Sequence, residues 1–213
     1  MPIVRFPDPK EAGPDGLLAV GGDLHPISLM NAYRQGIFPW PIEEGEPLLW
    51  FSPPERGVLD FSEIHIPKSL KKFLKKNSFR ISFDEAFDQV IEACASGRPT
   101  WITNELTEAY KVFHREGHAH SVEVWDGDEL VGGLYGVESD GSFAGESMFH
   151  LRPNTSKLAL LKLAEHLQTR GLHWMDIQVM TPHMKALGAK LIPRKEFLNR
   201  LVLTRSQGLR LFD

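Results

Sequence analysis

The sequence predicts an α+β fold with a mixed, mainly antiparallel sheet. Three strand patterns near residues 120–126, 129–137 and 142–149 are joined by tight-turn sequences, as in an antiparallel meander. A leucine-rich helix, a buried strand and a further helix follow, which is the order expected when helices pack on a sheet. The 213 residues are 42% hydrophobic, which supplies enough apolar material for a substantial core.

The first third of the chain is expected to be less regular. Residues 1–25 are rich in proline and glycine and predict an irregular, packed segment. A helix is predicted over 26–35, because proline suits the first turn of a helix and Gly36 suits its end. A turn at 38–41 and an acidic loop precede a strand predicted at 48–51.

A lysine-rich amphipathic helix is predicted after Pro67. Its apolar residues keep the i, i+3, i+4 spacing of a buried face, at Leu70, Phe73 and Leu74. Its other sides carry Lys68, Lys71, Lys72, Lys75 and Lys76. Most charge runs are only solvated faces, but residues 66–80 contain six basic residues and no acidic one, which favours contact with phosphate groups.

The remaining elements are placed by caps, turns and periodicity. In chain order they are a strand over 79–83, a helix from Asp84 to Gly97, a helix from Thr103 to Gly117, the three meander strands, a helix from Ser156 to Gly171, a strand over 174–179 and a helix from Thr181 to Gly188. This order resembles the core of the acetyl-CoA-dependent N-acetyltransferase (GNAT) fold. That fold holds the CoA pyrophosphate in a glycine-rich loop, whereas the corresponding segment here, 150–156, contains no glycine. CoA is therefore disfavoured, although backbone N–H groups at the helix start could hold an anion, and an N-acetyltransferase is the second hypothesis.

Composition indicates a soluble globular protein. The net charge of −4 argues mildly against a nucleic-acid partner, but residues 1–65 hold ten acidic and four basic residues, whereas residues 185–213 hold seven basic and two acidic ones. No apolar run approaches the roughly 20 residues that span a bilayer, and the first residues lack a signal pattern, so we expect a cytoplasmic protein. Cys94 is the single cysteine, which excludes an internal disulfide framework and a multi-cysteine metal site. His114 and His118 have metal-ligand spacing, but a helix end is expected between them, so no metal site is predicted.

Two buried strands carry isolated polar residues. On a strand, side chains at i and i+2 share a face, so Asp176 projects with Gln178 and Glu146 projects with Met148. Polar groups inside apolar strands cost free energy unless they are hydrogen-bonded. The pattern predicts a hydrogen-bonding pair and a carboxylate beside an apolar pocket, or else buried polar residues that hold a turn together.

Several stretches, in order along the chain, resemble the bacterial leucyl/phenylalanyl-tRNA–protein transferase family. They are Gly16–Leu24, Gly36–Trp40, Thr100–Thr103, Gly117–Trp125, Gly145–Phe149 and the pair Asp176 and Gln178. One stretch alone would be weak evidence for the family, whereas all of them in the family's order over roughly residues 15–203 make a strong match. The sequence departs from the family at Ile177, where Cys is more frequent, and at Leu134, where Met is common.

The resemblance implies a small N-terminal domain, residues 1–64, and a GNAT-like catalytic domain, residues 65–213. It implies transfer of Leu or Phe, and less readily Met, from aminoacyl-tRNA to the α-amino group of proteins that begin with Arg or Lys, which marks them for N-degron proteolysis. It implies no cofactor, neither metal nor CoA. The expected partners are aminoacyl-tRNA and these proteins, without a membrane, and the protein is expected to be a monomer.

Asp176 and Gln178 are the candidate catalytic residues. Conversion of an ester to an amide is downhill, and an α-amino group with a pKa near 8 is about 10% neutral at pH 7, so positioning matters more than a strong base. We expect Asp176 to accept a hydrogen bond from the Gln178 amide, so that the Gln178 oxygen orients the attacking amine. The proton would leave through the Asp176 carboxylate or the tRNA ribose hydroxyl.

The candidate substrate-binding residues divide by the part of the substrate they would contact. Glu146 is expected to bind the acceptor's Arg or Lys side chain, the alternative being an internal salt bridge. Met148, with Leu134 and Phe143, is expected to form the pocket for Leu or Phe, the alternative for Met148 being plain core packing.

The tRNA would be bound at two further places. Trp40 and Trp101 are expected to stack on the terminal adenosine, with Tyr33 and Tyr110 as neighbours, the alternative for either Trp being core packing. The five lysines of the 68–76 helix would contact the tRNA backbone, largely by shape. A third hypothesis, a non-catalytic RNA-binding module, rests on this helix alone.

Overall fold

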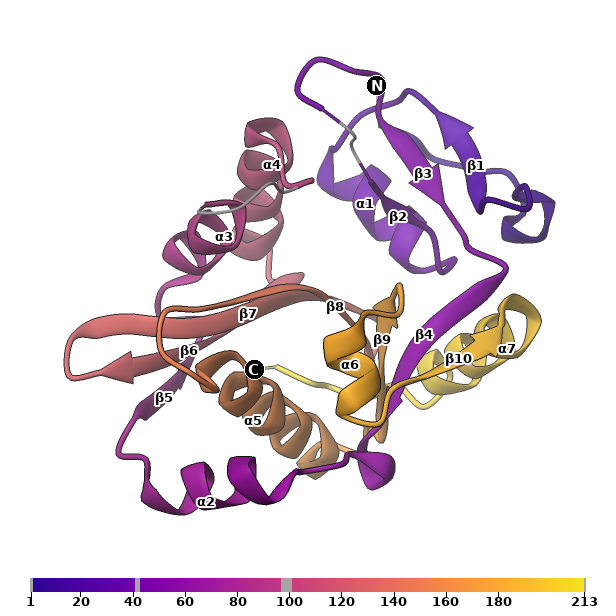
Figure 1. The fold of residues 1–213 in the computed structure, drawn as a ribbon. Coiled ribbons are helices and arrows are strands. Elements are labelled where there is room, and N and C mark those ends of the chain that lie inside the picture. The colour runs from indigo at the N-terminus through magenta and orange to yellow at the C-terminus, as the bar shows by residue number, and fades with distance from the viewer. Residues whose placement is uncertain (1, 41–42, 97–100, 213) are drawn as a thin grey trace.

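The computed structural model describes residues 2–40, 43–96 and 101–212, and it confirms the α+β class with a mixed, mainly antiparallel sheet (Figure 1). The larger sheet has seven strands in the order β10–β4–β9–β8–β7–β6–β5. In chain order these are β4 (Glu55–Asp60), β5 (Arg80–Phe83), β6 (Ala119–Asp126), β7 (Glu129–Ser139), β8 (Ser142–His150), β9 (Trp174–Gln178) and β10 (Lys190–Pro193). Neighbouring strands are antiparallel except β8 and β9, which are parallel.

A second, three-stranded sheet is formed by the N-terminal part of the chain. Its order is β1–β3–β2, with β1 at Leu17–Val20, β2 at Phe38–Pro39 and β3 at Leu49–Phe51. Helix α1 (Pro26–Tyr33) confirms the helix predicted there, and a short 3-10 helix, η1 (Pro9–Glu11), precedes β1. Strand β4, which the sequence did not predict, lies within residues 1–64 and yet joins the larger sheet between β9 and β10.

Helices cover both faces of the larger sheet (Figure 1). The helices not yet described are α2 (Lys68–Lys76), α3 (Phe87–Ala95), α4 (Asn104–Arg115), α5 (Thr155–Thr169), α6 (Pro182–Ala186), α7 (Arg194–Arg205) and the 3-10 helix η2 (Phe61–Glu63). The core has two clusters of buried residues. One includes α5, α7 and the strands beneath them, and the other joins α3 and α4 to α1 and the small sheet.

Of the four side chains predicted to cap helix starts, two do so and two do not. The hydroxyls of Thr103 and Thr181 accept hydrogen bonds from N–H groups of the first turns of α4 and α6. Asp84 does not cap α3, which begins at Phe87. Asp84 has a φ of 58°, and its carboxylate accepts from the N–H of Ser121 instead. Ser156 lies inside α5, which begins one residue earlier.

Some of the predictions fall outside the described residues or were not made. Gly97, the predicted end of α3, and Thr100 of the family motif lie outside the described residues. Strand β10 and helix α7 were not predicted, and both pack beside β4. One whole edge of the larger sheet was therefore not predicted from the sequence.

A cavity lies beside the parallel strands β8 and β9. Their register is set by one pair of partner residues, Ala144 and Asp176. The residues that follow on each strand, from Gly145 on β8 and Ile177 on β9, line this cavity.

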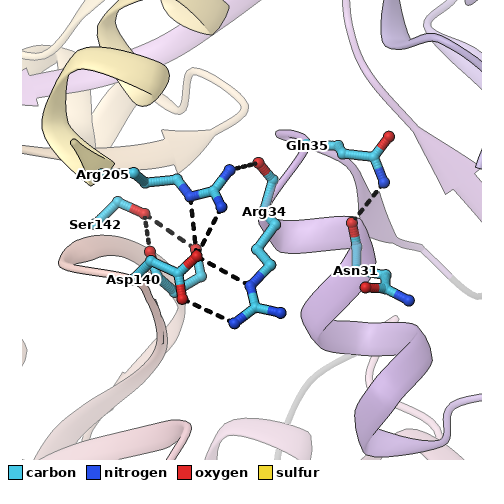
Figure 2. Close-up of polar contacts among 7 residues, drawn as sticks. Asn31, Arg34, Gln35, Asp140, Ser142 and Arg205 are labelled. Carbon is cyan, nitrogen blue, oxygen red and sulfur yellow. Dashed lines mark hydrogen bonds and ion pairs between the residues drawn. The ribbon is translucent and has the colours of Figure 1, made fainter. Parts of the chain in front are cut away.

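An ion-pair cluster ties the small sheet to the rest of the molecule (Figure 2). Asp140, in the turn between β7 and β8, accepts from Arg34 just after α1, at 2.9 and 3.0 Å, and from Arg205 at the end of α7, at 2.6 Å. Arg205 also donates to the Arg34 carbonyl at 2.6 Å. The two guanidinium groups hold the pKa of Asp140 below its usual range, so the cluster stays charged at neutral pH.

Candidate active site

A cavity of about 400 Å³, here called the main cavity, lies beside β8 and β9. Its apolar wall includes Leu134, Met148, Leu160, Met175, Ile177 and Met184. Glu146 lies on the same wall, so the predicted combination of a carboxylate and an apolar pocket is present. Leu134 and Met148 both line this cavity, and their contact with a Leu or Phe side chain stays a prediction. Phe143 does not line the cavity, because it is buried in the core and packs against Phe212.

Asp176 is bound in a buried ion pair. Arg56, on β4, donates from Nε and Nη2 to its two carboxylate oxygens at 2.8 and 2.7 Å. The guanidinium is 1% exposed and lies 4.5 Å from the ring centres of both Phe38 and Phe197. Nη1 donates to the Gly36 carbonyl at 3.1 Å. A buried charge of this kind is tolerated because it is both paired and well hydrogen-bonded.

Gln178 faces away from Asp176, contrary to the prediction. Its φ is 53°, in the left-handed region, and its backbone N–H donates to Asp176 Oδ1 at 2.9 Å. Its side-chain Nε2 donates to Glu146 Oε1 at 2.5 Å. The expected hydrogen bond from the Gln178 amide to Asp176 is therefore wrong. The alternation of side chains holds only for extended residues, and Gln178 leaves that conformation at the end of β9.

Glu146 has neutral hydrogen-bond partners. It accepts from Gln178, and the Tyr33 hydroxyl also donates to it and in turn hydrogen-bonds the Tyr110 hydroxyl. Among the described residues Glu146 forms no ion pair, so the alternative of an internal salt bridge does not apply to them. Burial, with the nearby charge of Asp176, raises the pKa of Glu146 to about 8 despite these hydrogen bonds.

Tyr135 lines the main cavity and carries a buried hydroxyl that is not used within the described chain. The side chain is fully buried, it lines the cavity, and its hydroxyl has no hydrogen-bond partner within the part of the chain that the structure describes. A buried hydroxyl is costly when it is unpaired, so a bound molecule that hydrogen-bonds it would be favoured. The sequence analysis passed over Tyr135 because it lies in a buried apolar strand, where an aromatic residue is ordinary.

A smaller hollow of about 120 Å³, here called the middle pocket, adjoins the main cavity. Glu146, Ile177 and Thr181 line both, and Gln178 lines the middle pocket. Trp40 and Trp101 also line it, with ring centres 5.6 Å apart. Both indoles are half-buried, so each is in contact with the core and also with a hollow. Tyr33 and Tyr110 lie behind Glu146 and are buried.

The lysine helix is amphipathic as predicted. Leu70 is buried, and Phe73 and Leu74 are half-buried against the core. All five lysines are exposed. None of them forms an ion pair with a described residue, so their charge is not neutralised within this part of the chain. In Figure 1, α2 lies beyond α5, at the opposite end of the molecule from the small sheet.

Arg56, like Tyr135, is a residue of the candidate site that the sequence patterns did not indicate. Its signal was weak: a single basic residue immediately before the apolar segment Gly57–Leu59. Because β4 was not predicted, nothing placed Arg56 beside a strand 120 residues away.

No group of three or more His, Cys, Asp or Glu residues with the arrangement of a metal site occurs within 2–40, 43–96 and 101–212. Across the same residues, the helices are too short or too polar to cross a membrane.

Comparison with known proteins identifies the family. The family model described as leucyl/phenylalanyl-tRNA protein transferase matches residues 58–202, and the model for the N-terminal domain of that transferase matches residues 22–54. The chain belongs to the leucyl/phenylalanyl-tRNA–protein transferase family. The resemblance expected from the motifs is confirmed. As a member of this family the chain is an aminoacyltransferase whose substrates are an aminoacyl-tRNA and a protein.

Similar relatives extend over nearly the whole chain. A leucyl/phenylalanyl-tRNA–protein transferase from Anaeromyxobacter sp. (strain K) is 50% identical over 94% of this chain and 91% of its own length. Another from Pectobacterium carotovorum subsp. carotovorum (strain PC1) is 52% identical over 93% of this chain and 86% of its own. A solved structure of a functionally unknown conserved protein from Staphylococcus epidermidis is 11% identical, with a TM-score of 0.41, over 83% of this chain and 68% of that one.

Proposed function

We propose that the main cavity and the middle pocket together form the transfer site of this enzyme. The enzyme moves Leu or Phe, and less readily Met, from aminoacyl-tRNA to the α-amino group of proteins that begin with Arg or Lys. One observation carries the proposal: the Gln178–Glu146 pair lies between an apolar cavity and a second pocket, and a buried ion pair holds it in place. An apolar cavity with a few fixed polar groups is the usual form of a ligand site.

Gln178 orients the attacking amine. Its Nε2 is committed to Glu146, and its side-chain oxygen accepts no hydrogen bond from the described residues. That oxygen can therefore accept from the α-amino group and direct its lone pair at the ester carbonyl. Holding two reacting groups in this way removes much of the entropic barrier.

The chemical step forms the C–N bond of the new peptide and breaks the bond between the acyl carbon and the ribose oxygen. The amine loses one proton and the ribose oxygen gains one, so no outside acid or base is consumed. Both Asp176 oxygens already accept from Arg56, which favours the ribose route over the Asp176 route for the proton. Asp176 then contributes by holding the backbone of Gln178.

Glu146 binds the cationic side chain of the acceptor. It is half-buried, it has no cation of its own among the described residues, and it lies beside Gln178. A charge-assisted hydrogen bond from Arg or Lys would give it the partner that Asp176 already has. This accounts for a requirement for Arg or Lys at the acceptor's N-terminus.

The aminoacyl-tRNA is held at three places. Leu134 and Met148 contact the Leu or Phe side chain in the main cavity, and a flexible thioether suits a site that takes both shapes. Trp40 and Trp101 stack on the terminal adenosine, where base stacking is worth about 1–3 kcal/mol. The lysines of α2 contact the tRNA backbone.

The decisive assay mixes the protein with Leu-charged tRNA and a peptide that begins with Arg. We expect a product heavier by one leucine, with the leucine at its N-terminus. The matched control is the same peptide with an acetylated N-terminus, which has no free amine and should stay unmodified. Unmodified Arg-peptide, with the tRNA still charged and the protein folded, would contradict the proposal.

The α2 lysines have their own test. Replacing Lys72 and Lys76 with Ala should weaken aminoacyl-tRNA binding at low salt. The steepness of its salt dependence should fall by about 0.7–0.9 for each phosphate group that the variant no longer neutralises. An unchanged slope would show that α2 is only a solvated face.

We further propose that the products are N-degron substrates, that the reaction takes place in the cytoplasm and that the enzyme acts as a monomer. The division into domains of residues 1–64 and 65–213, and the likeness of the second to the GNAT fold, also stay predictions.

A further inference from the structure

A third hollow, here called the outer groove, continues the middle pocket away from the main cavity. It has a volume of about 570 Å³. Phe38, Trp40 and Val179 line both the outer groove and the middle pocket. The floor of the outer groove includes Phe51, Met180 and Leu191. The three hollows therefore adjoin one another: Val179 lines all three, and Gln178 lines the middle one.

The outer groove is apolar and acidic. Val179 and Leu191 are 40% and 44% exposed, which is high for residues of this size and type. Asp15 and Glu55 also line it, and none of the described residues that line it is basic. The Glu55 side chain forms no hydrogen bond or ion pair with a described residue, so its charge is free to interact with a bound molecule. The groove lies on the part of the molecule where acidic residues outnumber basic ones.

We infer that the outer groove binds the acceptor polypeptide. It would contact the residues at positions two and three, which directly follow the N-terminal Arg or Lys. The inference rests on the proposed function. If the amine is held at Gln178 and the acyl group fills the main cavity, the acceptor chain can leave the middle pocket on the side of Phe38 and Val179, which also line the outer groove.

Charge separates a peptide from the other possible occupant, the 3′ end of the tRNA. Phosphate groups would be repelled by Asp15 and Glu55, and no lysine or arginine of the described chain lines the groove to bind them. A peptide with apolar or basic residues at these positions suits both the apolar floor and the acidic rim. The groove therefore favours acceptors with basic or apolar second and third residues and disfavours acidic ones.

The test compares peptides that begin with Arg and carry Lys, Leu or Asp at the second and third positions. Glu55→Lys should lower kcat/KM for the Lys peptide relative to the Asp peptide by about two- to fivefold, the size expected for an exposed charge pair. Leu191→Asp should raise the KM for the Leu peptide several-fold. In both variants the KM for aminoacyl-tRNA should stay unchanged.

Leu203→Asp is the matched control, because Leu203 is a 65% exposed leucine on α7 that lines none of these hollows. It should leave every constant unchanged. A raised KM for aminoacyl-tRNA in Glu55→Lys or Leu191→Asp, or peptide constants equal to those of the wild type, would overturn the inference while the wild type still transfers leucine. Absence of any product with the wild type would instead overturn the proposed function, and this inference with it.

Discussion

Asp176 and Glu146 lie on neighbouring strands and both contact Gln178, yet their surroundings are opposite. Asp176 has a buried guanidinium on both oxygens and holds the Gln178 backbone. Glu146 has only tyrosine and amide partners within the described chain, and burial raises its pKa to about 8. A paired carboxylate suits a fixed support, whereas a carboxylate without an ion pair suits the role proposed for Glu146, binding of the acceptor's cation. The difference shows how one glutamine can be held by its backbone and used by its side chain.

The largest expected effect is loss of the Asp176 support. Arg56→Ala leaves a buried carboxylate without its cation and should lower the free energy of unfolding by about 3–5 kcal/mol in urea titrations. Asp176→Asn removes the stranded charge, so the double variant should lose clearly less than the sum of the single losses. Additive losses, within about 0.5 kcal/mol, would show that the two residues are independent and that Asp176 is not a supported carboxylate.

Next is the glutamine that both carboxylates contact. Gln178→Gly keeps the left-handed backbone available but removes the side chain, so kcat for transfer should fall about 100-fold while aminoacyl-tRNA affinity and stability change little. Asparagine also tolerates this backbone conformation, but its side chain is one carbon shorter and its amide cannot reach the amine. Transfer by Gln178→Asn should therefore be slowed about as much as transfer by Gln178→Gly. A loss of less than about threefold in the Gly variant would be incompatible with an orienting role.

Glu146 should reveal its unpaired state through pH. A cationic acceptor needs the ionised carboxylate, so kcat/KM for Arg peptides should rise as pH increases toward 8. The rise should be steeper than deprotonation of the acceptor's α-ammonium group alone explains. Glu146→Gln should lose this extra rise, and its preference for Arg over Ala at the acceptor's first position should fall about tenfold. Equal weakening of peptide and aminoacyl-tRNA binding would count against the assigned role.

The same carboxyl affects stability. Its folded pKa lies above its unfolded value, so between about pH 4.3 and pH 8 the folded protein binds more protons than the unfolded chain. Wild-type stability should therefore fall as pH rises through this window, and Glu146→Gln should be flatter. Urea titrations of both proteins at pH 5 and pH 8.5 measure the difference. An equal loss of stability in the two proteins would show that a group other than Glu146 titrates.

The smallest effect is expected at Asp140, whose ion pairs resemble those of Asp176 but are exposed. Asp140→Asn should cost about 1 kcal/mol or less at pH 7, because solvent screens such pairs. The pKa of Asp140 is lowered in the folded state, so its contribution is present above the unfolded pKa and is lost as pH falls through the folded one. Asp128→Asn, at an exposed turn without an ion pair among the described residues, is the control. A loss as large as that of Arg56→Ala would remove the distinction between buried and exposed pairs.

Local patterns determined much of this protein from its sequence. Alternating strands and turn residues placed the meander, and the i, i+3, i+4 spacing placed α2 with its lysines outward. The ordered motifs indicated the family, and the polar residues within β8 and β9 indicated the site. These features depend on residues close together in the chain, where periodicity and side-chain chemistry are decisive.

Only the tertiary structure decided which partner each polar group has. Arg56 reaches Asp176 because β4 inserts between β9 and β10, a pairing that no local pattern encodes. Gln178 turns to Glu146 because one residue with a positive φ ends the alternation that strand residues otherwise obey. Long-range pairing is set by how strands bury one another, so the sequence could name the residues of the site but not their hydrogen bonds.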